Sequence, residues 1–424
     1  MFAQVPPLIR RNTALFALTQ SFTGAGMQFA YGFGPLMVME LTGSASLAGL
    51  SVGLMGISRF LVAYPAGKIT DAYGRKPGIQ LGLVLALIGT LTLFAAMRFQ
   101  SIAIFGAGLL IFGMGMNAAQ QLRVAAADMY PPKFRAQALG FVALGSLVGL
   151  IIGPIMIHYA EIIAPYLGQD PLGLPWLMLP VLIVGGMGLA ALVRPDPKEI
   201  GMNLRKYYPD HVAVPQVDGS DAERPKTDFS ARDLLANARM RLAIISNSAA
   251  NGNRSIVMVL TSLVLHHHGH SLSAIAFSHM FHSAGMFGFS IPLGRLADRF
   301  GRERVMFPGV ATTIAGAILL ALTSQWWSVT LGTFLVGIGW AAANVAATAL
   351  IADHAPAEHR GRAVGVNDSC AGATSVFAAL VTGPLIDWSG LPATGLTAVL
   401  MAAVPFVLLA LQRRTAVAEI APER

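Results

Sequence analysis

The chain has 424 residues, of which 54% are hydrophobic and only 12% are charged. Soluble domains carry about 25% charged residues, so this composition excludes a water-soluble globule. The net charge of +8 is compatible with nucleic-acid binding in general, but the basic residues here lie in short segments between apolar stretches. Cys370 is the only cysteine, which excludes a disulfide framework and a cysteine-based metal site.

Apolar stretches that are long enough to cross a membrane recur along the whole chain. The first follows Arg10 and Arg11 and is too long for the apolar core of a signal peptide, so we interpret it as a retained first span. A polar and aromatic turn at 323–327 divides one long uncharged stretch into two spans. The twelve predicted spans are 13–40, 45–67, 78–97, 100–129, 137–160, 173–193, 242–266, 271–293, 305–323, 327–352, 363–386 and 391–411.

The distribution of Lys and Arg predicts the orientation in the membrane. If the N-terminus is cytoplasmic, 25 of the 29 basic residues lie in cytoplasmic segments and only Arg98 lies in an external loop. The other three, Arg59, Arg123 and Arg254, lie within spans. This bias predicts a multi-pass protein of the inner (plasma) membrane with both termini in the cytoplasm.

The chain divides into two similar halves. Residues 194–241 are polar and contain five prolines, so we predict a cytoplasmic linker between a six-helix half at 1–193 and a six-helix half at 242–424. A loop motif built on Gly67, Asp71, Gly74 and Arg75 returns 227 residues later as Gly294, Asp298, Gly301 and Arg302. Asp128 returns as Asp353, 225 residues later. The predicted fold is therefore an all-α membrane protein with two pseudo-symmetric halves.

Small residues recur at four-residue spacing in the fifth span, at Gly145, Gly149 and Gly153, followed by Pro154. Small residues at this spacing allow membrane helices to approach closely. We therefore expect these positions to be helix-packing sites.

At these motifs the chain resembles the major facilitator superfamily, over its full length. The Gly149–Pro154 segment is similar to the motif of drug-exporting members. The glycines that normally follow its proline are missing, with Ile155, Met156 and Ile157 in their place, and Leu109 is apolar where exporters often have an arginine. The region 265–294 also resembles a group of uncharacterised bacterial members. The resemblance implies a transporter, and no enzyme motif or cofactor-binding motif is recognised in the sequence.

The loop motifs are expected to gate transport. Gly67 and Gly74 would permit a tight turn with positive φ. Asp71 would face the N-terminus of the eleventh span, and Arg75 would pair with Asp128. By symmetry, Asp298 would face the fifth span. Arg302 would likewise reach Asp353. Alternatively, these charges only satisfy the positive-inside rule.

Histidines gather around the seventh and eighth spans. His266, His267, His268 and His270 are either a polar turn at the outer interface, a proton sensor or a metal site. His279 and His282 are three residues apart and share a helix face. They are candidates for proton coupling, for a buried hydrogen-bonded pair or, less favoured because no carboxylate lies nearby, for a metal site. As site residues we predict them to couple protons, with no bound metal.

Three arginines within spans predict an electropositive cavity, because ionisable residues in membrane helices usually face one. Arg254 lies deepest, with Asn247, Asn251 and Asn253 beside it, while Arg59 and Arg123 lie closer to the span ends. Arg123 is near enough to the surface to snorkel. Arg254, Arg59, Arg123, Asn251 and Asn253 are the candidate substrate-binding residues.

We therefore predict a secondary active transporter, an antiporter or symporter, that moves a small organic anion by alternating access, with protons as a possible partner ion. It is expected to act as a monomer in the lipid bilayer, without nucleic acid, cofactor or metal. The alternative is proton-driven efflux of amphiphilic drug-like compounds, in which Arg254 only shapes the site. A membrane sensor or a histidine-box metal enzyme is less favoured, because the linker is short and most histidines face outward.

Overall fold

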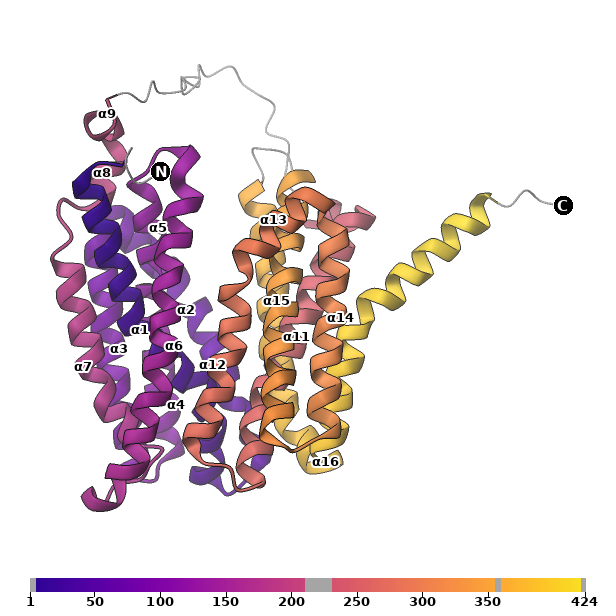
Figure 1. Ribbon diagram of the computed structural model, residues 1–424, viewed down its shortest axis with the longest axis horizontal. Coiled ribbons are helices and arrows are strands. Elements are labelled where there is room, and N and C mark those ends of the chain that lie inside the picture. Colours follow the sequence, from indigo (N-terminus) through magenta and orange to yellow (C-terminus); the bar gives the residue numbers. More distant parts are fainter. Residues whose placement is uncertain (1–4, 210–230, 355–359, 421–424) are drawn as a thin grey trace. The chain divides into compact units, whose positions relative to one another are not determined.

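The computed structural model describes residues 5–209, 231–354 and 360–420, and the regular structure within these ranges is entirely helical (Figure 1). The first group of helices is α1 (Pro7–Thr42), the short 3₁₀ helix η2 (Ala45–Leu47), α2 (Gly49–Tyr73), α3 (Arg75–Arg98), α4 (Ile102–Ala119), α5 (Gln121–Asp128), α6 (Pro132–Leu167), α7 (Leu174–Ala191), α8 (Pro197–Met202) and α9 (Leu204–Tyr207). The second group is α10 (Ala231–Ala236), α11 (Ala238–His267), α12 (Leu272–Gly288), α13 (Ser290–Phe300), α14 (Arg302–Leu322), α15 (Trp326–His354) and α16 (Arg360–Ile420).

The long helices follow the twelve predicted spans in chain order. One predicted span is broken into α4 and α5 at Gln120, and another into α12 and α13 at Phe289. The long α16 is two helices joined at Gly390, whose φ of 78° is not helical, and this bend lies between the last two predicted spans. Within the described residues, eight segments are long and apolar enough to cross a membrane. The predicted all-helical membrane fold is confirmed.

The chain forms two compact units. Unit 1 comprises Met1–Met27 and Ile57–Asp228, and unit 2 comprises Gln28–Gly56 and Phe229–Arg424. Unit 2 therefore includes the second part of α1 and the first part of α2. The division of the chain at a linker spanning 194–241 stays a prediction.

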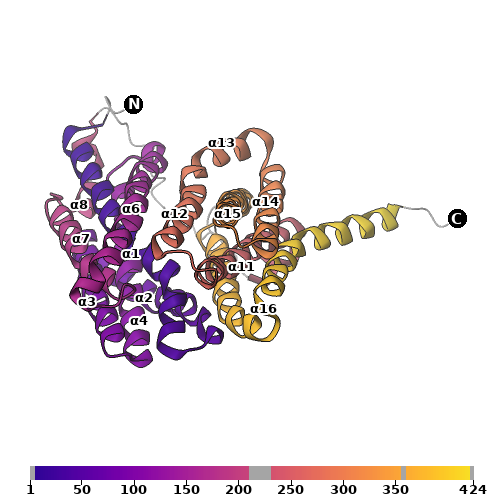
Figure 2. The ribbon, with the colours of Figure 1, turned by 60° about the horizontal axis from the view of Figure 1, so that its bottom comes forward.

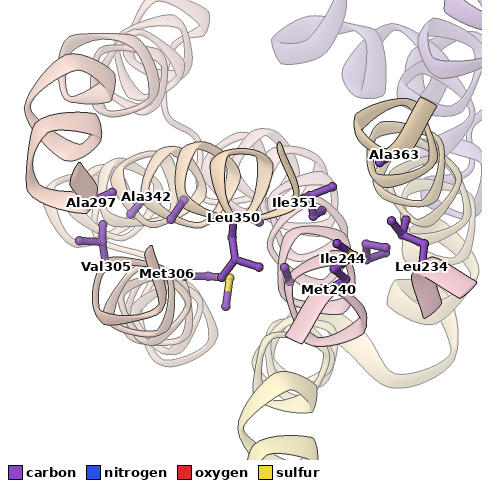
Figure 3. Close-up of a cluster of buried hydrophobic side chains, with 13 residues drawn as sticks. Leu234, Met240, Ile244, Ala297, Val305, Met306, Ala342, Leu350, Ile351 and Ala363 are labelled. Atoms are coloured by element: carbon purple, nitrogen blue, oxygen red, sulfur yellow. The ribbon is translucent and has the colours of Figure 1, made fainter. Parts of the chain in front are cut away.

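Unit 2 is organised around α15. This helix packs against α11, α12, α13, α14 and α16, and Figure 2 views it nearly end-on with these helices around it. A cluster of thirteen buried apolar residues joins the ends of these helices near α10, among them Met306 of α14, Leu350 of α15 and Ile244 of α11 (Figure 3). This packing gives α11 a fixed position beside α15 and α16, which matters for the site described below.

In unit 1, α6 packs closely on the first part of α1. A Cβ added at Gly149 would lie 2.6 Å from the carbonyl oxygen of Ser21 and 3.1 Å from the Cα of Gly24. A Cβ at Gly145 would meet the carbonyl of Ala17. Both glycines are needed for this close approach, as is typical of small residues at four-residue spacing.

Glycines with positive φ form the turns that precede α3 and α14. Gly74 has φ 105° and Gly301 has φ 99°, a region that favours glycine because it has no Cβ. The prediction that Gly67 also takes part in the turn was wrong. Gly67 lies inside α2, and Gly294 lies inside α13, so each turn depends on a single glycine.

Candidate functional site

Arg254 lies near the middle of α11 and is half-buried between two aromatic rings. Its guanidinium carbon is 5.8 Å from the centroid of Tyr31, on α1, and 5.7 Å from the centroid of Trp340, on α15. All three residues belong to unit 2. Distances below about 6 Å are those of cation–π interactions, so the two rings stabilise the positive charge and restrict its position.

Trp340 is in turn oriented by a chain of asparagines. Its indole Nε1–H donates to Oδ1 of Asn251 at 2.9 Å, and Nδ2 of Asn251 donates to Oδ1 of Asn247 at 3.1 Å. Nδ2 of Asn344 also donates to Oδ1 of Asn247, at 3.1 Å, while Nδ2 of Asn247 donates to Oδ1 of Asn367 at 3.2 Å. Asn247, Asn251 and Asn367 are buried, so this network satisfies polar groups that would otherwise be costly inside a helical bundle.

The chain of asparagines ends at a carboxylate. Nδ2 of Asn367 donates to Oδ1 of Asp368 at 3.2 Å, both on α16. From Trp340 to Asp368, each amide accepts a hydrogen bond from the preceding residue and donates one to the next, and Asn344 joins the chain as a branch at Asn247. We name Tyr31, Arg254 and Trp340 the aromatic clamp, and Asn247, Asn251, Asn344 and Asn367 the asparagine network.

The two buried histidines of α12 each present one nitrogen without a partner. His279 Nε2 lies 2.8 Å from Oγ of Ser262, whose hydroxyl proton is directed to the carbonyl of Gly32 at 2.5 Å, so the imidazole is the donor to Ser262. His282 Nδ1 donates to the carbonyl of Thr333 at 2.7 Å. Within the described residues, the other nitrogens, Nδ1 of His279 and Nε2 of His282, are buried and meet no hydrogen-bond partner. In a neutral imidazole these are lone pairs that can accept a proton.

The other histidines of the predicted cluster lie at the end of α11 and directly after it. His266, His267 and His268 are exposed and line one side of an apolar cavity of about 630 Å³ with Leu320 and Leu391. In the described part of the chain, no three His, Cys, Asp or Glu residues come together as a metal site.

The other predicted substrate-binding residues are distributed differently. Arg59 is exposed, and Arg123 donates from Nη2 to Oγ of Ser146 at 3.3 Å; both belong to unit 1. Asn253 is buried and donates to the carbonyl of Ala398 at 2.8 Å, in the second part of α16. Of the five predicted residues, Arg254 and Asn251 are thus joined through Trp340.

Both loop motifs contain an ion pair to the end of a neighbouring helix. Nε of Arg75 lies 2.7 Å from Oδ2 of Asp128, and Nε of Arg302 lies 3.1 Å from Oδ2 of Asp353. Arg302 also pairs with Asp298 through Nη1. The two predicted pairs to Asp128 and Asp353 are present, while the gating role of these residues stays a prediction.

Five residues of these sites were not predicted from the sequence: Tyr31, Trp340, Asn344, Asn367 and Asp196. Trp340 and the two asparagines lie inside spans, where a tryptophan far from the interface and a buried amide are both unusual; this was the available signal. Asp196 accepts from the backbone N–H groups of Arg75 at 3.1 Å and Lys76 at 2.9 Å, at the start of α3. Its place after the sixth span gave no indication of this contact.

Comparison with known proteins gives consistent results. The sequence model of the Major Facilitator Superfamily matches residues 16–215 and 242–424. The riboflavin transporter RfnT of Brucella anthropi is 28% identical over 393 residues, which are 90% of each chain. The uncharacterised MFS-type transporter YddS of Bacillus subtilis is 27% identical over 85% of this chain and 81% of its own. The crystal structure of the nucleoside transporter NupG superimposes with a TM-score of 0.68 over 95% of this chain and 97% of its own, at 13% identity.

Proposed function

The chain belongs to the Major Facilitator Superfamily and transports a small molecule across the membrane, and we propose that this molecule is an organic anion bound by Arg254. The observation that carries the proposal is the position of this guanidinium near the middle of α11, half-buried and held between Tyr31 and Trp340. Ionisable groups within membrane helices are costly and usually face a cavity.

The chemistry of the aromatic clamp supports an anion over a cation. The two rings lie beside the guanidinium, and a guanidinium is a planar fork of N–H groups that matches a carboxylate or phosphate. In surroundings of low dielectric constant, this interaction is stronger than in water. A cationic substrate would be repelled by the same charge.

The experiment is uptake by proteoliposomes that contain the purified protein. The probes are radiolabelled phthalate and succinate as anions, and benzyltrimethylammonium as a cation of similar size. Arg254→Ala should lower anion uptake at least about tenfold, since a hydrogen bond to a charged group contributes about 1.5–3 kcal/mol. Arg254→Lys should restore part of it. Arg98→Ala changes an exposed arginine at the end of α3 and is the matched control.

Two outcomes contradict the proposal. One is uptake of the cation in preference to both anions by the wild-type protein. The other is an Arg254→Ala variant that takes up anions as fast as the wild-type protein.

A second candidate function is riboflavin transport, which is favoured by the relative from Brucella anthropi that shares 28% identity over 90% of each chain. Riboflavin is uncharged at neutral pH, and it would use the aromatic rings of the site more than the guanidinium. Riboflavin uptake that survives Arg254→Ala would favour this candidate over the anion.

We further propose that His279 and His282 couple transport to protons, on the basis of their two buried unpartnered nitrogens. The double variant His279→Gln/His282→Gln should flatten the dependence of uptake on pH between about 5 and 8, the range in which imidazoles titrate. His158→Gln, at an exposed histidine of α6, is the control. If the double variant keeps the pH dependence of the wild-type protein, His279 and His282 do not couple transport to protons.

The gating role of the loop motifs, the cytoplasmic location of both termini and the inner-membrane location are part of the same proposal. Alternating access requires contacts that break and form on one side of the protein. Asp71→Asn and Asp298→Asn should each slow uptake while expression stays nearly unchanged. Full activity in both variants would remove the motifs from the transport cycle.

A further inference from the structure

The asparagine network is an unusually large polar structure behind a single indole. Asn247 and Asn367 are completely buried, and Asn251 is 8% exposed. Three helices contribute, because Asn247 and Asn251 lie on α11, Asn344 on α15 and Asn367 on α16. Buried amides are costly unless they are hydrogen-bonded, and a bonded network of this kind favours one side-chain arrangement.

What the network fixes is the plane of the Trp340 ring. The indole also packs against Ala250, Val310 and Ala343. If Trp340 only filled space there, an aliphatic side chain would do so without any polar partner. The hydrogen bond from Nε1 to Asn251 instead prevents rotation of the ring about its long axis.

The residues of the aromatic clamp are partly exposed to solvent, unlike the asparagines of α11. Tyr31, Arg254 and Trp340 are each partly exposed, while the asparagines of α11 behind them are buried. A ligand that reaches Arg254 therefore also meets the rings of Tyr31 and Trp340, which come from different helices. Aromatic groups attract one another in stacked and edge-to-face arrangements beyond the apolar area that they bury.

We infer that the substrate is an aromatic anion, a flat ring that carries a carboxylate or another acidic group. The acidic group binds Arg254, and the ring packs on Trp340, with Tyr31 beside it. The inference rests on the proposed function for the negative charge and adds the ring as a second requirement. Trp340 is then a specificity-determining residue, and Asn251 is a positioning residue that acts through it.

The test compares two ligands that carry the same two adjacent carboxylates, one on a planar aromatic ring and the other on a saturated ring. Phthalate and cyclohexane-1,2-dicarboxylate have the same two carboxylates on a six-membered ring, and their dissociation constants are measured with the purified protein by isothermal titration calorimetry. Wild-type protein should bind phthalate about 3- to 10-fold more tightly, which corresponds to the interaction of one aromatic pair.

The variants locate the preference. Trp340→Leu should bring the ratio of the two constants close to one, Trp340→Phe should keep an intermediate ratio, and Asn251→Ala should lower the ratio while leaving the indole in place. Trp327→Leu is the control, since Trp327 is a tryptophan of the same helix that is 72% exposed. Its ratio should equal that of the wild-type protein.

The inference is overturned if wild-type protein binds both dicarboxylates equally, if it binds neither, or if Trp340→Leu keeps the full preference. The ratio of the two dissociation constants in the wild-type protein tests the inference even if a variant does not fold. If wild-type protein binds both dicarboxylates equally and Arg254→Ala binds neither, the anion proposal stands and only the requirement for an aromatic ring is rejected. Binding of benzyltrimethylammonium in place of both dicarboxylates would instead overturn the proposed function itself.

Discussion

The turn before α3 and the turn before α14 are built from the same motif, 227 residues apart, but they are held differently. In both, a glycine with positive φ precedes an arginine that pairs with an aspartate at the end of another helix. In the first copy, Asp196 also accepts from the backbone N–H groups of Arg75 and Lys76, so the start of α3 is capped by a carboxylate. In the second copy, Arg302 pairs additionally with Asp298, which lies on the other side of the turn, in α13.

Exposure separates the two copies further. The side chains of Arg75 and Asp128 are 20% and 28% exposed, whereas Asp353 and Asp298 are 53% and 68% exposed. Water and salt screen the second set more than the first. The motif thus predicts which residues form an ion pair, while the solvent exposure of the pair determines how much it stabilises the fold.

The largest expected difference concerns the arginines. Arg75→Ala should lower the free energy of unfolding by about 2 kcal/mol, because it leaves a partly buried aspartate without its partner. Arg302→Ala should cost no more than about 0.5 kcal/mol, because its partners are largely exposed. The measurement is thermal unfolding of each purified variant in the same detergent. Equal losses in the two variants would show that the difference in exposure has no energetic consequence.

The second prediction concerns Asp196. Its carboxylate accepts from the backbone of Arg75 and Lys76 and also from Lys198 at 2.8 Å, so it caps both α3 and α8. Asp196→Ala should lower stability by about 1–2 kcal/mol, the usual value for losing an N-cap with a favourable charge. Asp298→Ala, in the second copy, is the comparison and should have a smaller effect. A variant at Asp196 as stable as the wild-type protein would contradict the capping role.

The order of the spans could be predicted from the sequence because uncharged stretches of sufficient length are rare outside membrane helices. The breaks at Gln120 and Phe289 were not predicted, since neither residue is a glycine or a proline. The long α11 is absent from the eight segments that are long and apolar enough to cross a membrane, because polar residues such as Asn247, Asn251 and Arg254 lower its hydropathy. The residues that weaken the membrane signal are those of the candidate site.

Arg254 could be predicted for the same reason that it is costly, because it is a charge far from either end of a span. Its two aromatic neighbours could not be predicted. Tyr31 and Trp340 come from helices distant in sequence, and helical periodicity states which residues share a face but not which helix that face meets. Asn251 was predicted from its proximity on α11, whereas Asn344 and Asn367 required knowledge of how α15 and α16 pack beside it.

The smallest expected effect is the difference in stability between the two glycine variants. Both Gly74→Ala and Gly301→Ala should lose about 1 kcal/mol or more, because each places a Cβ at positive φ. They differ in what the new methyl group meets. At Gly74 it would lie 2.8 Å from Oδ2 of Asp196, whereas at Gly301 no described atom lies within 4 Å.

Asp196 must therefore move in Gly74→Ala, and its hydrogen bonds to the start of α3 weaken. We expect Gly74→Ala to lose about 1 kcal/mol more than Gly301→Ala, within the range for a lost helix cap. A double-mutant cycle isolates this part, because in an Asp196→Ala background the added cost disappears and both glycine variants should then lose the same amount. If Gly74→Ala keeps its larger loss without the Asp196 carboxylate, the strain lies in the backbone of the first turn, and the cap does not explain why the two copies differ.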